Sequence, residues 1–118
     1  MSESNNHTAL SESTYYILLS LITPQHGYGI MQFIKKISND RLTLAPGTLY
    51  GAIKALLDKD WIKLHNTDIA ARKKVYVITD TGNRVLESEI VRLKELYQNG
   101  IEITGGRQND EKSEKKYL

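Results

Sequence analysis

Residues 46–79 read PGTLYGAIKALLDKDWIKLHNTDIAARKKVYVIT, and the period of their apolar side chains changes part-way along. In the first part, apolar residues recur at helical spacing, at Leu49, Ile53, Leu56 and Leu57. Pro46 suits the first turn of a helix, because the N–H that proline lacks would have no partner there. This part therefore predicts a helix from about Pro46 to Asp60.

The second part predicts a β-hairpin. Residues 61–65 alternate between apolar and polar side chains, and residues 74–79 alternate and are rich in β-branched and aromatic types. Residues 66–72 are polar at the start and basic at the end, which indicates a long hairpin tip. Trp61 and Tyr76 are expected in the core at the base of this hairpin.

Two helices are expected before this segment. The first runs from about residue 11 to 22, with Ser11 as its cap, and its apolar stripe consists of Tyr15, Leu18, Leu19 and Ile22. The second runs from about residue 28 to 38, with a stripe of Ile30, Phe33, Ile34 and Ile37. The alternation of residues 42–44 then predicts a strand of two or three residues that joins the hairpin.

A last helix is expected from Thr79 or Asp80 to about Gly100, where a glycine suits a left-handed C-cap. Its apolar residues follow an a/d seam of about two heptads, which favours dimerisation. They are Leu86, Ile90, Leu93 and Tyr97. The polar ends of the chain, residues 1–9 and 104–118, are expected to be disordered.

This order of elements predicts an α+β fold that is mainly helical. It is the layout of a winged helix-turn-helix domain over residues 10–79, followed by a dimerisation helix and its end over residues 80–103. The helix of residues 46–60 would enter the major groove of DNA, and the hairpin would be the wing.

Composition suits a small globular protein and excludes several classes. The chain has 118 residues, of which 25% are charged and 40% hydrophobic, and it has no cysteine for disulfides or thiolate metal sites. Its three histidines are too scattered for a metal site, and no catalytic group of residues is recognisable, so we expect neither an enzyme nor a cofactor. The polar start and the short apolar runs predict a cytoplasmic protein.

Charge is unevenly distributed along the chain. The net charge is +2, but residues 28–79 carry nine Lys or Arg against four acidic residues, a net of +5, which leaves −3 for the remainder. The middle of the chain is therefore the candidate for contact with an anionic partner.

The side of the 46–60 helix opposite its apolar stripe carries the candidate reading residues Gly47, Thr48, Tyr50, Gly51 and Lys54. A mid-helix glycine costs about 1 kcal/mol relative to alanine, so Gly51 suggests close approach of a DNA backbone or groove wall. Lys54 can reach a phosphate or a guanine edge, and the hydroxyl side chains can contact DNA as well. The alternative is that Gly51 packs under a neighbouring loop.

On the wing, Arg72, Lys73 and Lys74 are candidates for phosphate contacts. Strand alternation would keep the three from sharing one face, although a flexible tip relaxes that limit. The alternative is an edge strand that its lysines protect from aggregation. His26 and Tyr28, around the turn before the second helix, are further DNA-binding candidates.

Four motifs in the chain resemble the PadR family of bacterial transcriptional regulators. They are YYILL at 15–19, HGYGI at 26–30, PGTLY at 46–50, and KVYVIT at 74–79 followed by Gly82. The resemblance covers about residues 10–99. The length is similar to that of the short subfamily, which has a single C-terminal dimerisation helix.

The resemblance implies a homodimer that binds a palindromic operator in double-stranded DNA and usually represses transcription. Some short members bind small aromatic or phenolic effectors in a cavity between subunits, bounded by the first and last helices. The candidates for that lining here are Tyr15, Tyr16, Leu93 and Tyr97. The chain departs from the family at Ala45, where a capping serine is common, and its last helix has no tryptophan.

A second possibility is a winged-helix module that binds protein and not DNA, because this fold serves both purposes. The basic wing, together with the exposed face around Gly51 and Lys54, favours DNA.

Overall fold

The computed structural model describes residues 9–105. The first two helices each begin directly after a residue whose side chain caps them, whereas the third has no side-chain cap. α1 (Glu12–Ser20) begins after Ser11, whose side chain accepts a hydrogen bond from the Thr14 N–H at 3.1 Å. α2 (Gly27–Ile37) begins after His26, which caps it with its side chain. α3 (Pro46–Asp58) begins after Ala45, which provides no side-chain cap, as expected.

A three-stranded antiparallel sheet contains the wing. β2 (Ile62–Asp68) and β3 (Lys73–Ile78) form the hairpin, and the short strand β1 (Gln25–His26) pairs with the other edge of β3. The prediction of a strand at residues 42–44 was wrong, because that segment is irregular. Leu42 and Leu44 pack against the core instead, so their alternation reflects a loop that lies on it.

The last helix, α4 (Asp80–Ile103), is longer than the sequence indicated. Gly100 lies inside it, so the prediction of a C-cap there was wrong, and Gly105 adopts the left-handed conformation beyond the end, with φ 81°. The chain divides into two compact units within α4, after Glu87. The segments expected to be disordered lie outside the described residues, except for residues 9, 104 and 105.

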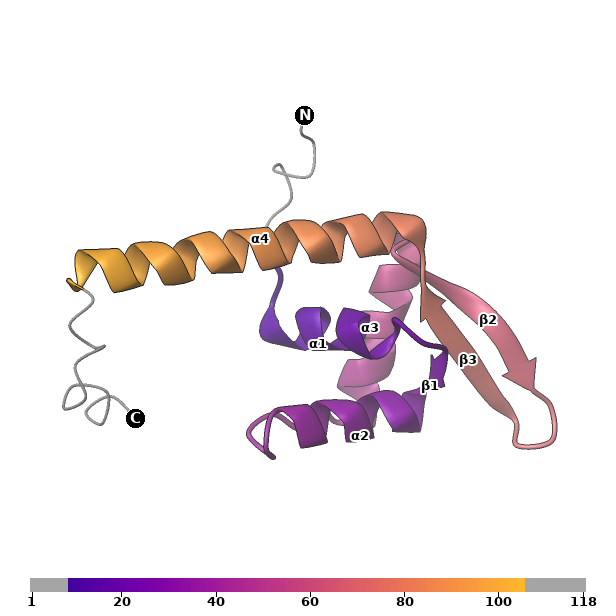
Figure 1. Ribbon diagram of the computed structural model, residues 1–118. Coiled ribbons are helices and arrows are strands. Elements are labelled where there is room, and N and C mark those ends of the chain that lie inside the picture. Colours follow the sequence, from indigo (N-terminus) through magenta and orange to yellow (C-terminus); the bar gives the residue numbers. More distant parts are fainter. Residues whose placement is uncertain (1–8, 106–118) are drawn as a thin grey trace. The chain divides into compact units, whose positions relative to one another are not determined.

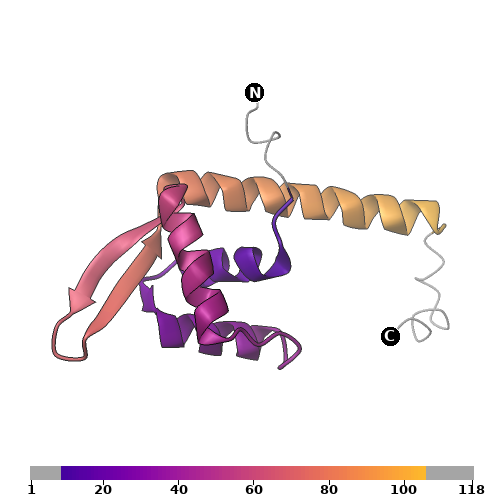
Figure 2. The ribbon, with the colours of Figure 1, turned by 180° about the vertical axis from the view of Figure 1, so that it is seen from behind.

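The core of the first unit is formed by α1, α2, α3, the hairpin and Leu86 at the start of α4. Figures 1 and 2 show the hairpin extending away from α1, α2 and α3. The fully buried members of the core include Ile17, Leu18, Leu21, Ile30, Ile34 and Leu49. The predicted stripe of α1 was partly wrong, since Ile22 is 50% exposed whereas Ile17 and Leu21 are buried. The predicted winged helix-turn-helix architecture, with a C-terminal helix after it, is confirmed.

The base of the wing is held by Thr79, the residue between β3 and α4. Its hydroxyl donates a hydrogen bond to the Asp60 carbonyl at 2.7 Å and accepts one from the Gly82 N–H at 3.0 Å. Because Asp60 follows α3 and Gly82 lies in the first turn of α4, these bonds connect α3, the wing and the start of the last helix.

Candidate nucleic-acid interface

The outer face of α3 is open to solvent where the sequence predicted a reading face. Its five candidate residues, Gly47, Thr48, Tyr50, Gly51 and Lys54, are all exposed. The opposite side of the helix is buried in the core, with Leu49, Ile53 and Leu56 between 0% and 3% exposed. The helix is therefore anchored by one face and presents the other.

Gly51 has no packing role in the described part of the chain. A Cβ atom placed on it would have no heavy-atom neighbour within 4 Å among residues 9–105, apart from its own helix and its chain neighbours, and the same holds for Gly47. The alternative that Gly51 packs under a neighbouring loop is therefore wrong. Because neither glycine has a side chain, a large partner can approach the backbone of α3 closely at both positions.

Lys54 lies on this face in a weak ion pair. Its Nζ is 3.7 Å from Oδ2 of Asp58, one helical turn later, and the two side chains are 78% and 68% exposed. Exposed pairs of this kind contribute roughly 0–1 kcal/mol, so a phosphate or a base edge can displace Asp58 at little cost.

His26 links the start of α2 to the wing. Its Nδ1 accepts a hydrogen bond from the Gly29 N–H at 3.2 Å, which caps the helix. In the sheet, His26 lies opposite Val75 and Gln25 lies opposite Tyr76. The pairing of β1 with β3 therefore keeps the N-terminal end of α2 beside the wing, which the sequence did not predict.

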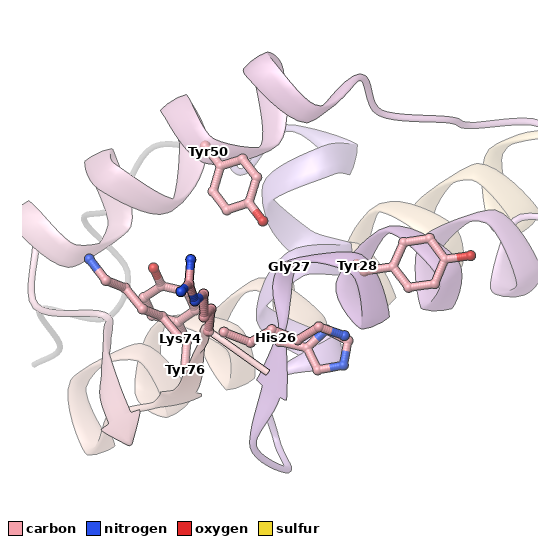
Figure 3. A pocket seen from close by; sticks show the side chains of 8 residues that line it. His26, Gly27, Tyr28, Tyr50, Lys74 and Tyr76 are labelled. Carbon is pink, nitrogen blue, oxygen red and sulfur yellow. The ribbon is translucent and has the colours of Figure 1, made fainter. Parts of the chain in front are cut away.

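Tyr50 leans from α3 towards the same place. A Cβ atom on Gly27 would collide with the Tyr50 ring and hydroxyl, so the tyrosine packs directly on the first residue of α2. Figure 3 shows its side chain reaching from α3 towards Gly27. Tyr28, in contrast, points away and its hydroxyl accepts a hydrogen bond from Nε2 of Gln32 at 3.2 Å (Figure 3).

The tip of the wing is a short turn and not the long loop that the sequence indicated. β2 continues to Asp68, whose Oδ1 accepts a hydrogen bond from the Ala71 N–H at 3.1 Å. The Arg72 N–H donates to the Ile69 carbonyl at 3.2 Å, and Arg72 has a left-handed backbone with φ 57°. Arg72 therefore lies in the turn, outside the alternation of β3.

These elements surround one hollow of about 290 Å³, which we call the wing hollow. It is lined by His26, Gly27, Tyr28, Tyr50, Arg72, Lys73, Lys74 and Tyr76 (Figure 3). All three wing cations thus border one concave surface, although strand alternation argued against a shared face. Six of the ten predicted DNA-binding residues meet here, and the other four, Gly47, Thr48, Gly51 and Lys54, lie on α3.

Tyr76 is the lining residue that sequence reasoning assigned to the core alone. It is 7% exposed and belongs to the core cluster, as expected, but it also borders the wing hollow. Burial raises the pKa of its hydroxyl, and the nearby Tyr50 raises it further. The signal that could have found it is the residue's position in β3, close to the wing cations in sequence.

The first residue of the predicted dimer seam, Leu86, is not exposed on α4. Leu86 is 3% exposed and lies in the core of the first unit, so it offers almost no surface to a second subunit. Ile90, Leu93 and Tyr97 are 44%, 38% and 68% exposed on α4. Val91, Leu96 and Ile103, which the seam did not include, are exposed apolar residues of the same helix.

The remaining effector candidates lie on α1. Tyr15 and Tyr16 are partly buried and pack on one another, with ring centroids 5.8 Å apart at an angle of 53°. Residues 9–105 contain no group of three or more His, Cys, Asp or Glu side chains placed to hold a metal ion. No helix in that range combines the length and the apolar composition that a membrane span requires.

A comparison with protein families matches residues 17–88 to the transcriptional regulator PadR-like family. The chain belongs to this family. PadR-like proteins are transcriptional regulators and not enzymes, so the prediction that the chain has no enzymatic activity is confirmed. A comparison with curated proteins finds no match.

Solved structures of two PadR-like proteins and of one further DNA-binding protein have the same fold. A PadR-like transcription factor from Bacteroides fragilis is 25% identical, with a TM-score of 0.62 over 77% of this chain and 87% of that one. A PadR family regulator from Eggerthella lenta is 20% identical, with a TM-score of 0.64 over 78% and 80% of the two chains. BpsR of Bordetella bronchiseptica, whose DNA binding is regulated by 6-hydroxynicotinic acid, is 14% identical, with a TM-score of 0.61 over 86% and 69%.

Proposed function

We propose that this PadR-like protein is a homodimeric, sequence-specific DNA-binding repressor. The observation that carries the proposal is the exposed outer face of α3, which carries Lys54, together with the wing hollow, which Tyr50 of the same helix and the cations Arg72, Lys73 and Lys74 border. On this surface Gly51 lets the groove wall approach, and Lys54 contacts a base edge or a phosphate. The wing cations contact the backbone and contribute affinity without sequence preference.

Dimerisation through α4 would place two copies of this surface on one palindromic site. The exposed residues Ile90, Leu93 and Tyr97 support an apolar interface on that helix. Two symmetric subunits bind half-sites one helical turn apart, or a multiple of it, so the operator would repeat the protein's two-fold symmetry.

The proposal includes release from DNA by a small aromatic or phenolic effector, held by Tyr15 or Tyr16 together with Leu93 and Tyr97. BpsR, which shares the fold, provides a precedent for such regulation in its response to 6-hydroxynicotinic acid. An effector would relieve repression only if it binds the conformation that is unable to bind DNA more tightly than the competent one.

Selection of bound sequences from random duplex DNA tests the function. We expect a palindromic consensus sequence that is bound by a dimer. The affinity should fall steeply as the salt concentration rises through the range found in the cytoplasm, where we place the protein. Repeating the selection with phenolic acids and planar dyes tests the effector, which should reduce the recovered DNA and raise the melting temperature of the protein. Failure to enrich any sequence, with no salt-dependent gel shift, would support the protein-binding winged-helix module instead.

A further inference from the structure

The wing hollow is bordered by Tyr76, a largely buried residue whose hydroxyl has no hydrogen-bonding partner within residues 9–105. Tyr76 is 7% exposed, and no described residue forms a hydrogen bond with its hydroxyl. Buried polar groups are normally paired, because leaving one unpaired costs the free energy of removing it from water. The Tyr76 hydroxyl lies in the lining of an accessible hollow, so a bound molecule can provide the missing partner.

The groups around this hydroxyl select for negative charge. Arg72, Lys73 and Lys74 border the hollow, and none of the lining residues in the described part of the chain is acidic. Burial raises the pKa of Tyr76, so its hydroxyl keeps its proton at neutral pH and can donate a hydrogen bond. His26 uses Nδ1 as an acceptor for the Gly29 N–H, which leaves Nε2 as the nitrogen that carries the proton of the neutral ring.

The size of the hollow indicates more than a lone inorganic ion. Its volume of about 290 Å³ is close to the lower end of the range for small-molecule sites, about 300–1,000 Å³. Tyr50 is 49% exposed and borders the hollow, so its ring offers an aromatic surface beside the cations. Aromatic rings pack favourably against one another in offset or edge-to-face arrangements.

We propose that the wing hollow binds a small aromatic oxyanion, such as an aryl phosphate or an aromatic carboxylate. The charged group lies among the wing cations and accepts a hydrogen bond from Tyr76, and the ring lies beside Tyr50. All the residues involved belong to the first unit, so the site is complete in one subunit. It is therefore separate from the effector cavity proposed between subunits.

The consequence for regulation rests on the proposed DNA-binding function. The wing cations that hold the ligand are the ones proposed to contact the DNA backbone. A free aromatic oxyanion would then compete directly with a DNA phosphate, without any change in the spacing of the two reading helices.

Calorimetric titration of the full chain tests the site. Phenyl phosphate and benzoate are the probes, and phenol and inorganic phosphate supply the ring and the charge separately. We expect phenyl phosphate to bind more tightly than phenol or phosphate alone. Tyr76→Phe removes only the hydroxyl and should weaken binding of phenyl phosphate by about tenfold or more, as expected for a hydrogen bond to a charged group.

The matched control is Lys35→Ala, which removes an exposed cation of α2 that does not border the hollow. It should leave the affinity for phenyl phosphate unchanged. If Tyr76→Phe does not fold, as judged by its melting curve, Tyr50→Ala takes its place, because it removes the aromatic ring proposed to lie beside the ligand and should also weaken binding of phenyl phosphate. Equal binding of phenol and phenyl phosphate, or full affinity in the folded tyrosine variant, would overturn the proposal.

A competition assay separates this proposal from the proposed function. If the protein binds its selected duplex but neither probe, the ligand site is wrong and the DNA-binding function stands. If Tyr76→Phe weakens binding of phenyl phosphate and no duplex binds, the site stands and the function is wrong. If both bind, phenyl phosphate should release the duplex from the wild type at lower concentration than from Tyr76→Phe.

Discussion

The carbonyl oxygen of Trp61 lies where a Cβ atom on Gly82 would have to be. The same carbonyl accepts a hydrogen bond from the Thr79 N–H at 3.0 Å, so it lies between this hydrogen bond and the Gly82 backbone. Trp61 precedes β2 and Gly82 belongs to the first turn of α4, and their contact therefore sets how closely the wing base approaches the last helix.

Gly82→Ala should destabilise the protein, because the new methyl group meets backbone that cannot move aside. Overpacking of this kind costs about 1–3 kcal/mol, which a urea denaturation curve can measure. Gly100→Ala is the matched control, since a Cβ atom there meets no described atom and alanine favours a helix interior by roughly 0.5–1 kcal/mol. Equal stability of the two variants would contradict the contact.

Gly51→Ala should separate stability from DNA binding. The position is open, so alanine should stabilise α3 by up to about 1 kcal/mol. If a groove wall approaches the glycine, the same methyl group should weaken binding to the selected duplex. Denaturation and gel shift on one preparation give both results, and unchanged or tighter DNA binding would remove Gly51 from the interface.

Replacing Arg72, Lys73 and Lys74 with alanine should weaken binding to all duplexes alike. Each lost phosphate contact should reduce the slope of log affinity against log salt by about 0.9. Lys36→Ala, at an exposed cation of α2 away from the wing hollow, is the control. A wing variant that changed sequence preference while keeping its salt slope would reverse the roles assigned to wing and α3.

Leu93→Asp should give a folded monomer. Leu93 is 38% exposed in the single chain, so the carboxylate stays hydrated there, but in an apolar interface it would be buried without a partner. Light scattering measures the mass, and circular dichroism checks the fold. Glu95→Ala, an exposed position on the same helix, should remain dimeric. A native dimer of Leu93→Asp would refute the proposed interface.

Glu12 should make stability depend on pH through its ion pair with Arg41. Hydrogen bonding from the Arg41 guanidinium lowers the pKa of Glu12 below its usual 4.5. Because the folded-state pKa is the lower one, the pair stabilises the fold above pH 4.5, and this contribution is lost as the pH falls through the folded-state pKa.

The measurement is the difference in melting temperature between the wild type and Glu12→Gln. This difference should be present at neutral pH and shrink in acid. In an Arg41→Ala background it should be small at every pH, since the partner is gone. A difference that persists in acid would show that the ion pair is not its source.

The helices and the hairpin could be predicted from the sequence because their signals are local. Ser11, Pro46 and the period of the apolar side chains act within one or two turns, and alternation in residues 74–79 acts within one strand. Such signals also predicted which side of α3 is exposed, since a helix anchored by Leu49, Ile53 and Leu56 must present its other side to solvent.

Other features depended on contacts between distant residues and appeared only in the tertiary structure. Pairing of residues 25–26 with β3 made them a strand, whereas residues 42–44 alternate because they lie on the core. Leu86 fits a heptad seam, but packing in the first unit buries it. A periodic pattern shows that a side chain avoids water and does not show which surface covers it.

The wing hollow illustrates the same division. The sequence identified its three cations, because a run of basic residues is visible without a fold. It did not place Tyr50 against Gly27, or Tyr76 beside both, since these residues come from α3, α2 and β3 and meet only when the sheet and helices pack. Sequence determines which side chains are available for chemistry, and packing determines which of them share one site.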